Sequence, residues 1–187
     1  MTTDRPSSSP APDGAPARDP ATLRVAIISD THFPRRGRSL PDDVLPRLRN
    51  ADAVVHAGDL CDLQALDELR TLGPPVHVVL GNNDRPLRQL LPETLTLELG
   101  GHRIGVVHDG GDRRGRLRRL RRWFPGHDAV IFGHSHVPEH EIDPADGFQV
   151  FNPGSLTDRR HRWPVHTFGE ALIDADGIRF ALFERGA

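Results

Sequence analysis

Six short segments of the chain place histidine, aspartate or asparagine directly after an apolar stretch, and most of them also contain glycine. They are Ser29-Asp30-Thr31-His32, Gly58-Asp59, Gly81-Asn82-Asn83-Asp84, His108-Asp109, Gly133-His134-Ser135-His136 and Asn152-Pro153-Gly154-Ser155. Imidazole nitrogens, together with carboxylate and amide oxygens, are donors for divalent ions such as Mn, Fe, Zn and Ni. The chemistry that these residue types indicate is therefore metal binding.

Seven side chains are the candidate metal ligands: Asp30, His32, Asp59, Asn82, His108, His134 and His136. A single catalytic ion keeps one position open for water, so seven ligands are too many for one ion and suit two. Two ions about 3.5–4 Å apart share a carboxylate, and Asp59, in the middle of the set, is the natural bridge. We interpret Asp84 as an outer acceptor that orients Asn82 or a ligand histidine.

The apolar stretches before these segments predict β-strands, and amphipathic stretches between them predict helices. The expected strands are 23–28, 53–56, 76–80, 94–99, 103–107, 129–132, 149–151, 170–173 and 178–183, and the expected helices are 41–49, 62–72 and 113–124. This alternation predicts an α/β layered domain with helices outside and sheet inside. Because ligand crevices of open α/β sheets lie at the carboxyl ends of strands, the six segments should converge. In extended chain the outer residues of Asp30-Thr31-His32 would point to one face, and the two histidines around Ser135 would do the same.

In this order and at these strand ends, the segments resemble the motif set of the calcineurin-like metallophosphoesterases. Gly81-Asn82-Asn83-Asp84 and the later Asn152-Pro153-Gly154-Ser155 are most similar to the small single-domain bacterial and archaeal phosphodiesterases of that superfamily. The resemblance extends from about Leu23 to the C-terminus. It implies a four-layer αββα sandwich, in which two packed mixed β-sheets are flanked by helices.

The resemblance also implies how the candidate ligands divide between two ions. One ion is held by Asp30, His32, Asp59 and His136, and the other by Asp59, Asn82, His108 and His134. A hydroxide that bridges the ions would attack the phosphorus of a phosphate ester in line. Mn is the metal we expect, with Fe, Zn and Ni as alternatives. The residues expected to take part in catalysis are Asp59, Asn82, His134 and Asp84.

Two positions depart from the usual motifs of the superfamily. Many members have histidine where this chain has Asn83, and that histidine is taken as the acid that protonates the leaving group. An amide cannot supply a proton in this way, so the substitution favours substrates with a good leaving group, or an acid from elsewhere in the chain. The usual His-Gly pair is His108-Asp109-Gly110 here, and we expect the local turn to differ.

Two classes of function fit these motifs. The first is hydrolysis of phosphate esters, with a phosphodiesterase favoured and a dinucleoside-polyphosphate hydrolase or protein phosphatase as the alternative. The second is a non-catalytic interaction module, because the retromer complex contains a subunit of this fold whose metal site has decayed and whose surface binds partners. All seven candidate positions carry residues that can bind a metal, and this favours the enzyme.

The composition of the chain limits its partners. The 187 residues carry 24 basic and 26 acidic side chains, a net charge of -2, so neither sequence-specific nucleic-acid binding nor an anionic membrane surface is expected. A small phosphorylated substrate, nucleotides included, fits better, and a homo-oligomer is left open. One cysteine, no apolar run of membrane-spanning length and no signal-peptide pattern predict a cytoplasmic protein.

Several further features stand outside the candidate site. Residues 1–21, rich in Pro, Ser and Ala, predict a disordered tail, and 22–187 are expected to form one phosphoesterase domain. Seven arginines within 113–122 surround Leu117 and Leu120, which predicts a solvated helix face, with attraction of phosphorylated substrates as the alternative. Arg159 and Arg160 follow the Pro-Gly turn and could contact a phosphate. We interpret the following residues as structural: His56, Cys61, His77, His102, His127, His140, His161 and His166.

Overall fold

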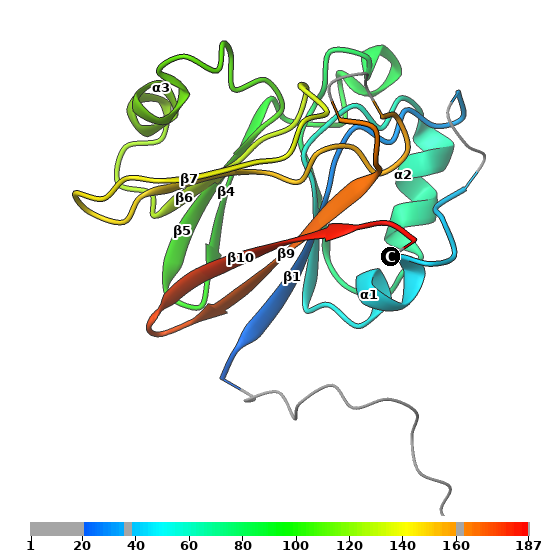
Figure 1. Ribbon diagram of the computed structural model, residues 1–187. Coiled ribbons are helices and arrows are strands. Elements are labelled where there is room, and N and C mark those ends of the chain that lie inside the picture. Colours follow the sequence, from blue (N-terminus) through cyan, green and yellow to red (C-terminus); the bar gives the residue numbers. More distant parts are fainter. Residues whose placement is uncertain (1–20, 36–38, 160–162, 187) are drawn as a thin grey trace, which may run out of the picture.

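The structure, a computed structural model, describes residues 21–35, 39–159 and 163–186. This part of the chain folds into two five-stranded sheets and a few short helices (Figure 1). The first sheet, in the order β10-β9-β1-β2-β3, contains β1 (Leu23–Ile28), β2 (Ala53–His56), β3 (Val76–Val78), β9 (Thr167–Asp174) and β10 (Gly177–Glu184). The second, in the order β4-β5-β6-β8-β7, contains β4 (Thr94–Leu99), β5 (His102–Val107), β6 (Ala129–Ile131), β7 (Glu139–Ile142) and β8 (Gln149–Asn152). The helices are α1 (Leu45–Arg49), α2 (Leu63–Arg70), α3 (Arg116–Trp123) and the 3-10 turn η1 (Arg85–Leu87).

The two sheets pack face to face, and each is covered on its outer side by helix (Figure 1). Three clusters of buried side chains fill the three interfaces. Ile27 of β1 packs with Val106 of β5 between the sheets, Leu66 of α2 packs on the first sheet, and Leu120 of α3 packs with Phe132 beside the second. Burial of these apolar surfaces is the main favourable contribution to folding. The order helix–sheet–sheet–helix, with both parallel and antiparallel strand pairs, confirms the predicted four-layer sandwich.

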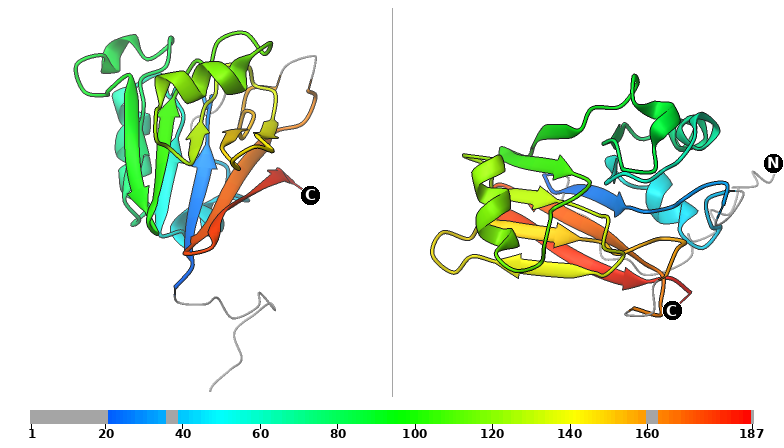
Figure 2. Two further views of the ribbon diagram at one scale, coloured as in Figure 1. Left: turned by 90° about the vertical axis from the view of Figure 1, so that its left-hand side faces the viewer. Right: turned by 90° about the horizontal axis from the view of Figure 1, so that it is seen from above.

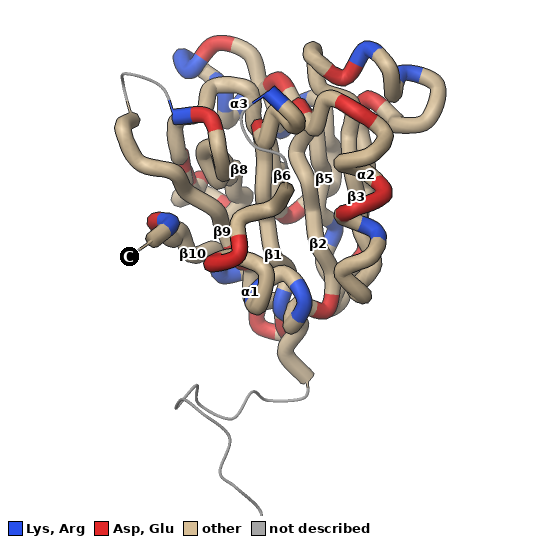
Figure 3. Tube along the Cα trace, turned by 90° about the vertical axis from the view of Figure 1, so that its right-hand side faces the viewer, with Lys and Arg blue, Asp and Glu red and all other residues tan. Residues whose placement is uncertain are grey.

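The inner strands have the composition that burial on both faces requires. All residues of β2 and β6 are buried, and all are apolar except His56. Valine and isoleucine fit such strands because their branched side chains pack well on a pleated surface. Neither strand carries a charged residue, and charges lie mainly in the surrounding loops and helices (Figure 3).

Parallel pairing brings the candidate site together. β1 pairs in parallel with β2 and β2 with β3, while β5 pairs in parallel with β6 and β6 with β8. Parallel strands end at the same edge of a sheet, so the loops after these six strands meet at one end of the sandwich. This is the upper end in the left view of Figure 2.

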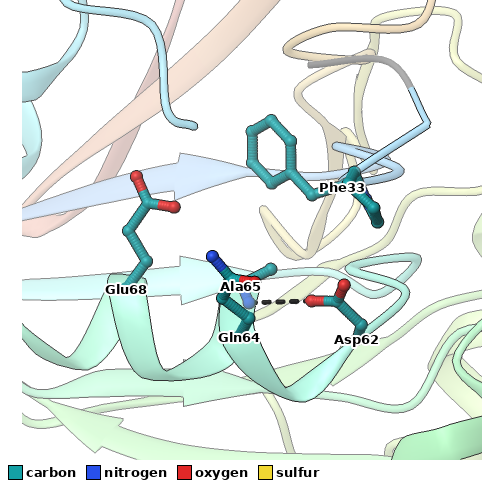
Figure 4. Close-up of a pocket in the computed structure, with 6 residues that line it drawn as sticks. Phe33, Asp62, Gln64, Ala65 and Glu68 are labelled. Atoms are coloured by element: carbon teal, nitrogen blue, oxygen red, sulfur yellow. Dashed lines mark hydrogen bonds between the residues drawn. The ribbon is translucent and has the colours of Figure 1, made fainter. Parts of the chain in front are cut away.

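The helices are shorter than predicted, and each difference has a local cause. α1 was expected from Pro41, but Val44 N–H bonds to the Pro41 carbonyl at 3.1 Å in a separate turn. α3 was expected from residue 113, but Gly115 has a φ of +72°, a left-handed conformation that cannot belong to a right-handed helix. α2 begins after Asp62, whose carboxylate accepts a 2.8 Å hydrogen bond from Ala65 N–H and caps the helix (Figure 4).

The strands were predicted more closely. β4 and β5, both predicted as strands, pair as a hairpin with Gly100 and Gly101 at φ of +58° and +85°, as its two-residue turn requires. β7 was not predicted as a separate strand, because it lies at the edge of its sheet and three of its four residues are exposed.

The predicted tail lies outside the described residues, apart from Ala21. None of the described helices has the length and apolar character needed to cross a membrane.

Candidate metal centre

The seven candidate ligands come from five loops and lie together at the carboxyl ends of β1, β2, β3, β5 and β6. Their donor atoms form two neighbouring groups. In the first, Asp30 Oδ1 lies 3.3 Å from His136 Nε2 and 3.9 Å from His32 Nε2. The two Nε2 atoms are 3.3 Å apart. Three donor atoms, two of them imidazole nitrogens, therefore face one point.

The second group lies beside the first and is more open. Asn82 Oδ1 is 3.0 Å from His108 Nε2 and 2.8 Å from His134 Nδ1, and these two nitrogens are 3.3 Å apart. His108 is buried, whereas the side chain of His134 is 45% exposed. Asp109, which follows His108 where glycine is usual, has its carboxylate 3.9 Å from His134 Nε2. Solvent and a substrate can reach this group from the His134 side.

Asp59 lies between the two groups. Its Oδ2 atom is 3.6 Å from His32 Nε2 and 3.5 Å from His108 Nε2, so one carboxylate oxygen faces an imidazole of each group. Asp30 is also close to Asp59 and His108, since one donor atom from each of the three lies within 4.8 Å of the others. We assign it to the first group because its Oδ1 atom lies 3.3 Å from His136 Nε2. The position of Asp59 is the one that a shared carboxylate needs.

Five of the seven candidate ligands have a left-handed backbone. The φ angles of Asp30, His32, Asp59, His134 and His136 lie between +48° and +69°. For residues other than glycine this conformation costs about 1–2 kcal/mol each, and such strain is typical of functional sites. The prediction of extended chain was therefore wrong for both histidine-containing segments. His134 and His136 also contact different groups, because the curled loop separates them.

Three glycines allow the loops to approach the ligands. A Cβ atom on Gly81 would lie 2.2 Å from Asp59 N, and one on Gly133 would lie 2.1 Å from Ser29 Oγ and 2.8 Å from Asp30 Oδ2. A Cβ atom on Gly58 would lie 2.6 Å from His108 Nδ1. No side chain fits at these distances. These glycines are needed for close packing around the donor atoms as well as for turning the chain.

Hydrogen bonds fix which nitrogen of two imidazoles is free to bind a metal. His108 Nδ1 donates to the carbonyl of Ala57 at 2.7 Å, and His136 Nδ1 donates to the carbonyl of Asp158. Each ring then presents Nε2, the nitrogen that would bind a metal, to its donor group. Outer carbonyl acceptors of this kind orient metal-bound histidines in proteins.

The charges of the site also fit a metal. Asp30 Oδ1 is buried and has no hydrogen-bond partner in the described part of the chain, an arrangement that a cation would satisfy. Burial lowers the pKa of His32, which favours the neutral ring that a metal needs. Burial also lowers the pKa of His108, but Asp59 and Asp30 outweigh it and raise the pKa to about 9. A metal must displace that proton, so its affinity should increase with pH.

Two residues of the Gly81-Asn82-Asn83-Asp84 segment support Asp59. Asn83 donates from its backbone N–H to Asp59 Oδ1 and from its side chain to Asp59 Oδ2, both at 2.7 Å. Asp84 accepts hydrogen bonds from the backbone N–H groups of Gly81, Cys61 and Asp59, at 2.7, 2.6 and 3.0 Å. Asp84 was expected to orient Asn82 or a histidine, but these bonds tie the two loops that carry Asp59 and Asn82.

Asn152-Pro153-Gly154-Ser155 lies behind the donor atoms. Asn152 Nδ2 donates to the Gly133 carbonyl at 2.8 Å, and Ser155 Oγ donates to the Asp30 carbonyl at 2.7 Å. Both side chains are buried. The segment therefore holds the loops of Asp30 and Gly133 in place, as a wall behind the site.

The sequence did not identify two residues close to the ligands. Asp158 has a carboxylate oxygen 3.7 Å from His136 Nδ1 and 4.0 Å from His32 Nε2, and its position three residues after Ser155 was the available signal. His56 is fully buried behind the site, where Nε2 contacts Thr31 Oγ1 at 3.0 Å and Nδ1 accepts from Gly58 N–H at 3.2 Å. A histidine at the end of a buried strand, directly before the Asp59 loop, was its signal.

Some arginines of the segment 113–122 pack against the rest of the protein. Arg116 is buried, lies over the ring of Phe132 and donates to Glu139 at 2.7 Å, while Arg121 pairs with Asp143 at 2.8 Å. The prediction of a solvated face is thus right for only part of this helix. Arg159 donates to the Pro164 carbonyl at 3.3 Å, and Arg160 and His161 lie outside the described residues.

Comparison with known proteins relates this chain to metallophosphoesterases. The calcineurin-like phosphoesterase superfamily domain matches residues 23–176. A probable metallophosphoesterase of Methanothermobacter thermautotrophicus is 36% identical over 163 residues, which cover 84% of this chain and 92% of the relative. A probable metallophosphoesterase of Methanocaldococcus jannaschii is 38% identical over 141 residues, covering 73% and 69%.

Solved structures of similar proteins share the fold of this chain. Vps29 of Entamoeba histolytica in complex with Zn²⁺ is 30% identical, with a TM-score of 0.66 over 87% of this chain and 99% of that one. A Thermotoga maritima protein, also 30% identical, has a TM-score of 0.67 over the same shares. A predicted phosphoesterase of Streptococcus pneumoniae shares the fold at 23% identity, with a TM-score of 0.64 over 88% and 99%. With the family match over residues 23–176, the chain belongs to the calcineurin-like phosphoesterase superfamily.

Proposed function

We propose that this protein is a phosphodiesterase that uses two divalent metal ions, with Mn preferred, to hydrolyse small phosphate esters. The observation that carries the proposal is the position of Asp59 Oδ2, 3.6 Å from His32 Nε2 and 3.5 Å from His108 Nε2. Ions bound there would lower the pKa of a bound water, supply a nucleophile at neutral pH and offset charge on the phosphate. Family membership supports a metal-dependent phosphoester hydrolase.

The seven candidate ligands would be divided between the two ions. Asp30, His32 and His136 would hold one ion, Asn82, His108 and His134 the other, and Asp59 both. Their rigid loops would keep the ester phosphorus in line with the attacking water, and positioning of this kind contributes a large share of a catalytic effect. The open side of His134 would admit the substrate.

The preference for esters with a good leaving group rests on Asn83, and the preference for diesters rests on the likeness to the small single-domain phosphodiesterases of the superfamily. Its backbone N–H and its side-chain amide each donate a hydrogen bond to Asp59. The side chain therefore stabilises the shared carboxylate and supplies no acid for the departing oxygen. An ester whose alcohol leaves as a stable anion needs no such acid, whereas a simple alkyl monoester does.

The test is turnover after removal and return of metal. The protein is stripped with a chelator, and hydrolysis of bis-p-nitrophenyl phosphate and p-nitrophenyl phosphate is followed after adding Mn, Ni, Zn or Mg in turn. We expect turnover only with metal, a higher kcat/KM for the diester and the largest rate with Mn. Equal rates with and without metal would contradict the proposal.

The second candidate function is a metal-binding interaction module. Its support is the similarity to Vps29, including the 30% identical Entamoeba histolytica protein that was solved with Zn²⁺. Two metal equivalents bound without turnover of either ester would favour this function over hydrolysis. Capture of a protein partner that requires the bound metal would support it further.

A further inference from the structure

A pocket of about 680 Å³ opens beside the second group of donor atoms. Asn82 and His108 are among its lining residues, so the organic substituent of a phosphate bound at that group would lie next to this pocket. The volume is large enough for a nucleoside, since small-molecule sites span roughly 300–1,000 Å³. The pocket is therefore where the structure can select between esters.

Trp123 gives the pocket an aromatic wall. It is the last residue of α3 and is 50% exposed, although Leu120 of the same helix and Phe124, which follows the helix, are buried. Leu91 and Val107 add apolar surface to the lining. An exposed tryptophan beside apolar side chains offers a flat face on which an aromatic ring can stack.

Arg88 gives the same pocket a free cation. Within the described part of the chain, its guanidinium has no ion pair or hydrogen bond, whereas Arg116 and Arg121 are both paired. A guanidinium binds phosphate oxygens through two parallel N–H donors. Glu93 and Thr94 in the lining could accept hydrogen bonds from the N–H and hydroxyl groups of a nucleoside.

Two other pockets lack these properties. One of about 210 Å³, between Phe33 and α2, is lined by the carboxylates of Asp62 and Glu68 and, among the residues that the structure describes, by no basic one (Figure 4). Another, of about 370 Å³, contains Arg47 and Arg185, which are paired with Glu170 and Asp43. Neither is lined by a candidate ligand.

We propose that the pocket of Trp123 and Arg88 binds the nucleoside part of a nucleotide substrate. The base stacks on Trp123, and Arg88 pairs with a phosphate oxygen of the nucleotide, next to the second donor group. The inference rests on the proposed function, because it places the reacting phosphate at Asn82 and His108. It adds a substrate class and two specificity-determining residues.

The test is calorimetric binding of AMP and adenosine to the Mn-loaded protein. Trp123→Leu should weaken both ligands by about tenfold or more, because it keeps an apolar side chain but removes the stacking face. Trp123→Phe should restore most of the affinity. Arg88→Gln should weaken AMP by about tenfold and leave adenosine unchanged, because adenosine has no phosphate. Arg118→Gln, an exposed arginine of α3 outside the pocket lining, is the control and should change neither.

The outcomes separate this inference from the proposed function. Equal adenosine affinity of wild type and Trp123→Leu, or no adenosine binding by wild type, would overturn the pocket assignment even if bis-p-nitrophenyl phosphate is hydrolysed. Binding of both ligands with the predicted losses, but no metal-dependent turnover, would support the pocket and refute the hydrolase. Equal loss of AMP affinity in Arg88→Gln and Arg118→Gln would contradict a specific contact between Arg88 and the phosphate, because the loss would then follow from the net charge alone.

Discussion

Asp59 is the residue on which both donor groups depend, since one of its oxygens faces an imidazole of each. Hydrogen bonds from His108 and Asn83 outweigh the effect of burial and hold its pKa below the usual range. The carboxylate is therefore charged at any pH at which metal would bind, and no proton competes for it. Replacing Asp59 should therefore weaken the binding of both ions.

Asp59→Asn should reduce metal binding at both sites and lower kcat/KM by a factor on the order of 10² or more, since changes to outer partners of a ligand already cost 10–100-fold. His136→Ala should remove mainly one of two metal equivalents. Metal content after dialysis, measured by mass spectrometry, distinguishes the two variants. Retention of both equivalents by Asp59→Asn would contradict the shared position.

His56 should make the stability of the metal-free protein depend on pH. Burial lowers its pKa from 6.5 to about 4, so between these values the unfolded chain binds a proton that the folded chain does not. The free energy of unfolding should therefore fall as pH decreases from 6.5 to 4, by about 3 kcal/mol at about 1.4 kcal/mol per pH unit. Urea titrations of wild type and His56→Asn across this range measure the difference. The variant should lose this part of the dependence, and identical slopes would show that His56 does not contribute.

At the scale of the elements, the strands were predictable and the conformation of the loops was not. A run such as β2 is apolar and β-branched, so its burial follows from composition alone. The left-handed backbone of Asp30 and His134 could not be predicted from their residue types alone, because these types adopt it only in some contexts and contacts with other loops decide it here. The candidate ligands could be recognised from their positions at strand ends, and their division between two ions came from the family resemblance. The curled loops that separate His134 from His136 were not predicted. Asp158 was not predicted, because its position three residues after Ser155 does not by itself show that the carboxylate lies near His136 Nδ1.

Gly81→Ala should disturb the metal centre through the loop that carries Asn82. Its Cβ would lie 2.2 Å from the backbone nitrogen of Asp59, which cannot move without shifting the carboxylate. We expect a loss of stability of about 1–3 kcal/mol together with weaker metal binding. Gly105→Ala is the matched control, because its Cβ would meet the Phe124 ring at 2.5 Å, in the cluster between α3 and the second sheet. The control should lose stability but keep its metal affinity, and an equal loss of metal affinity in both variants would contradict the local explanation.

At the scale of the whole molecule, the two sheets meet at the metal centre. Asp30 and Asp59 follow strands of the first sheet, and His108 and His134 follow strands of the second. An ion held by residues from both sheets would bind the folded chain and not the unfolded one. Metal binding should therefore stabilise the whole sandwich.

At a free metal concentration of about 100 times Kd, each occupied site should add about 2.7 kcal/mol. For a chain of this size, 1 kcal/mol raises Tm by about 2–4 °C, so we expect about 5–10 °C per site. Thermal unfolding with chelator and with Mn measures the shift. Gly105→Ala should have a lower Tm than wild type both with chelator and with Mn, but Mn should raise its Tm as much as it raises that of wild type. In Asp59→Asn, Mn should raise the Tm much less. A full shift in Asp59→Asn would mean that the ions bind elsewhere, because no site that depends on Asp59 could then supply the stabilisation.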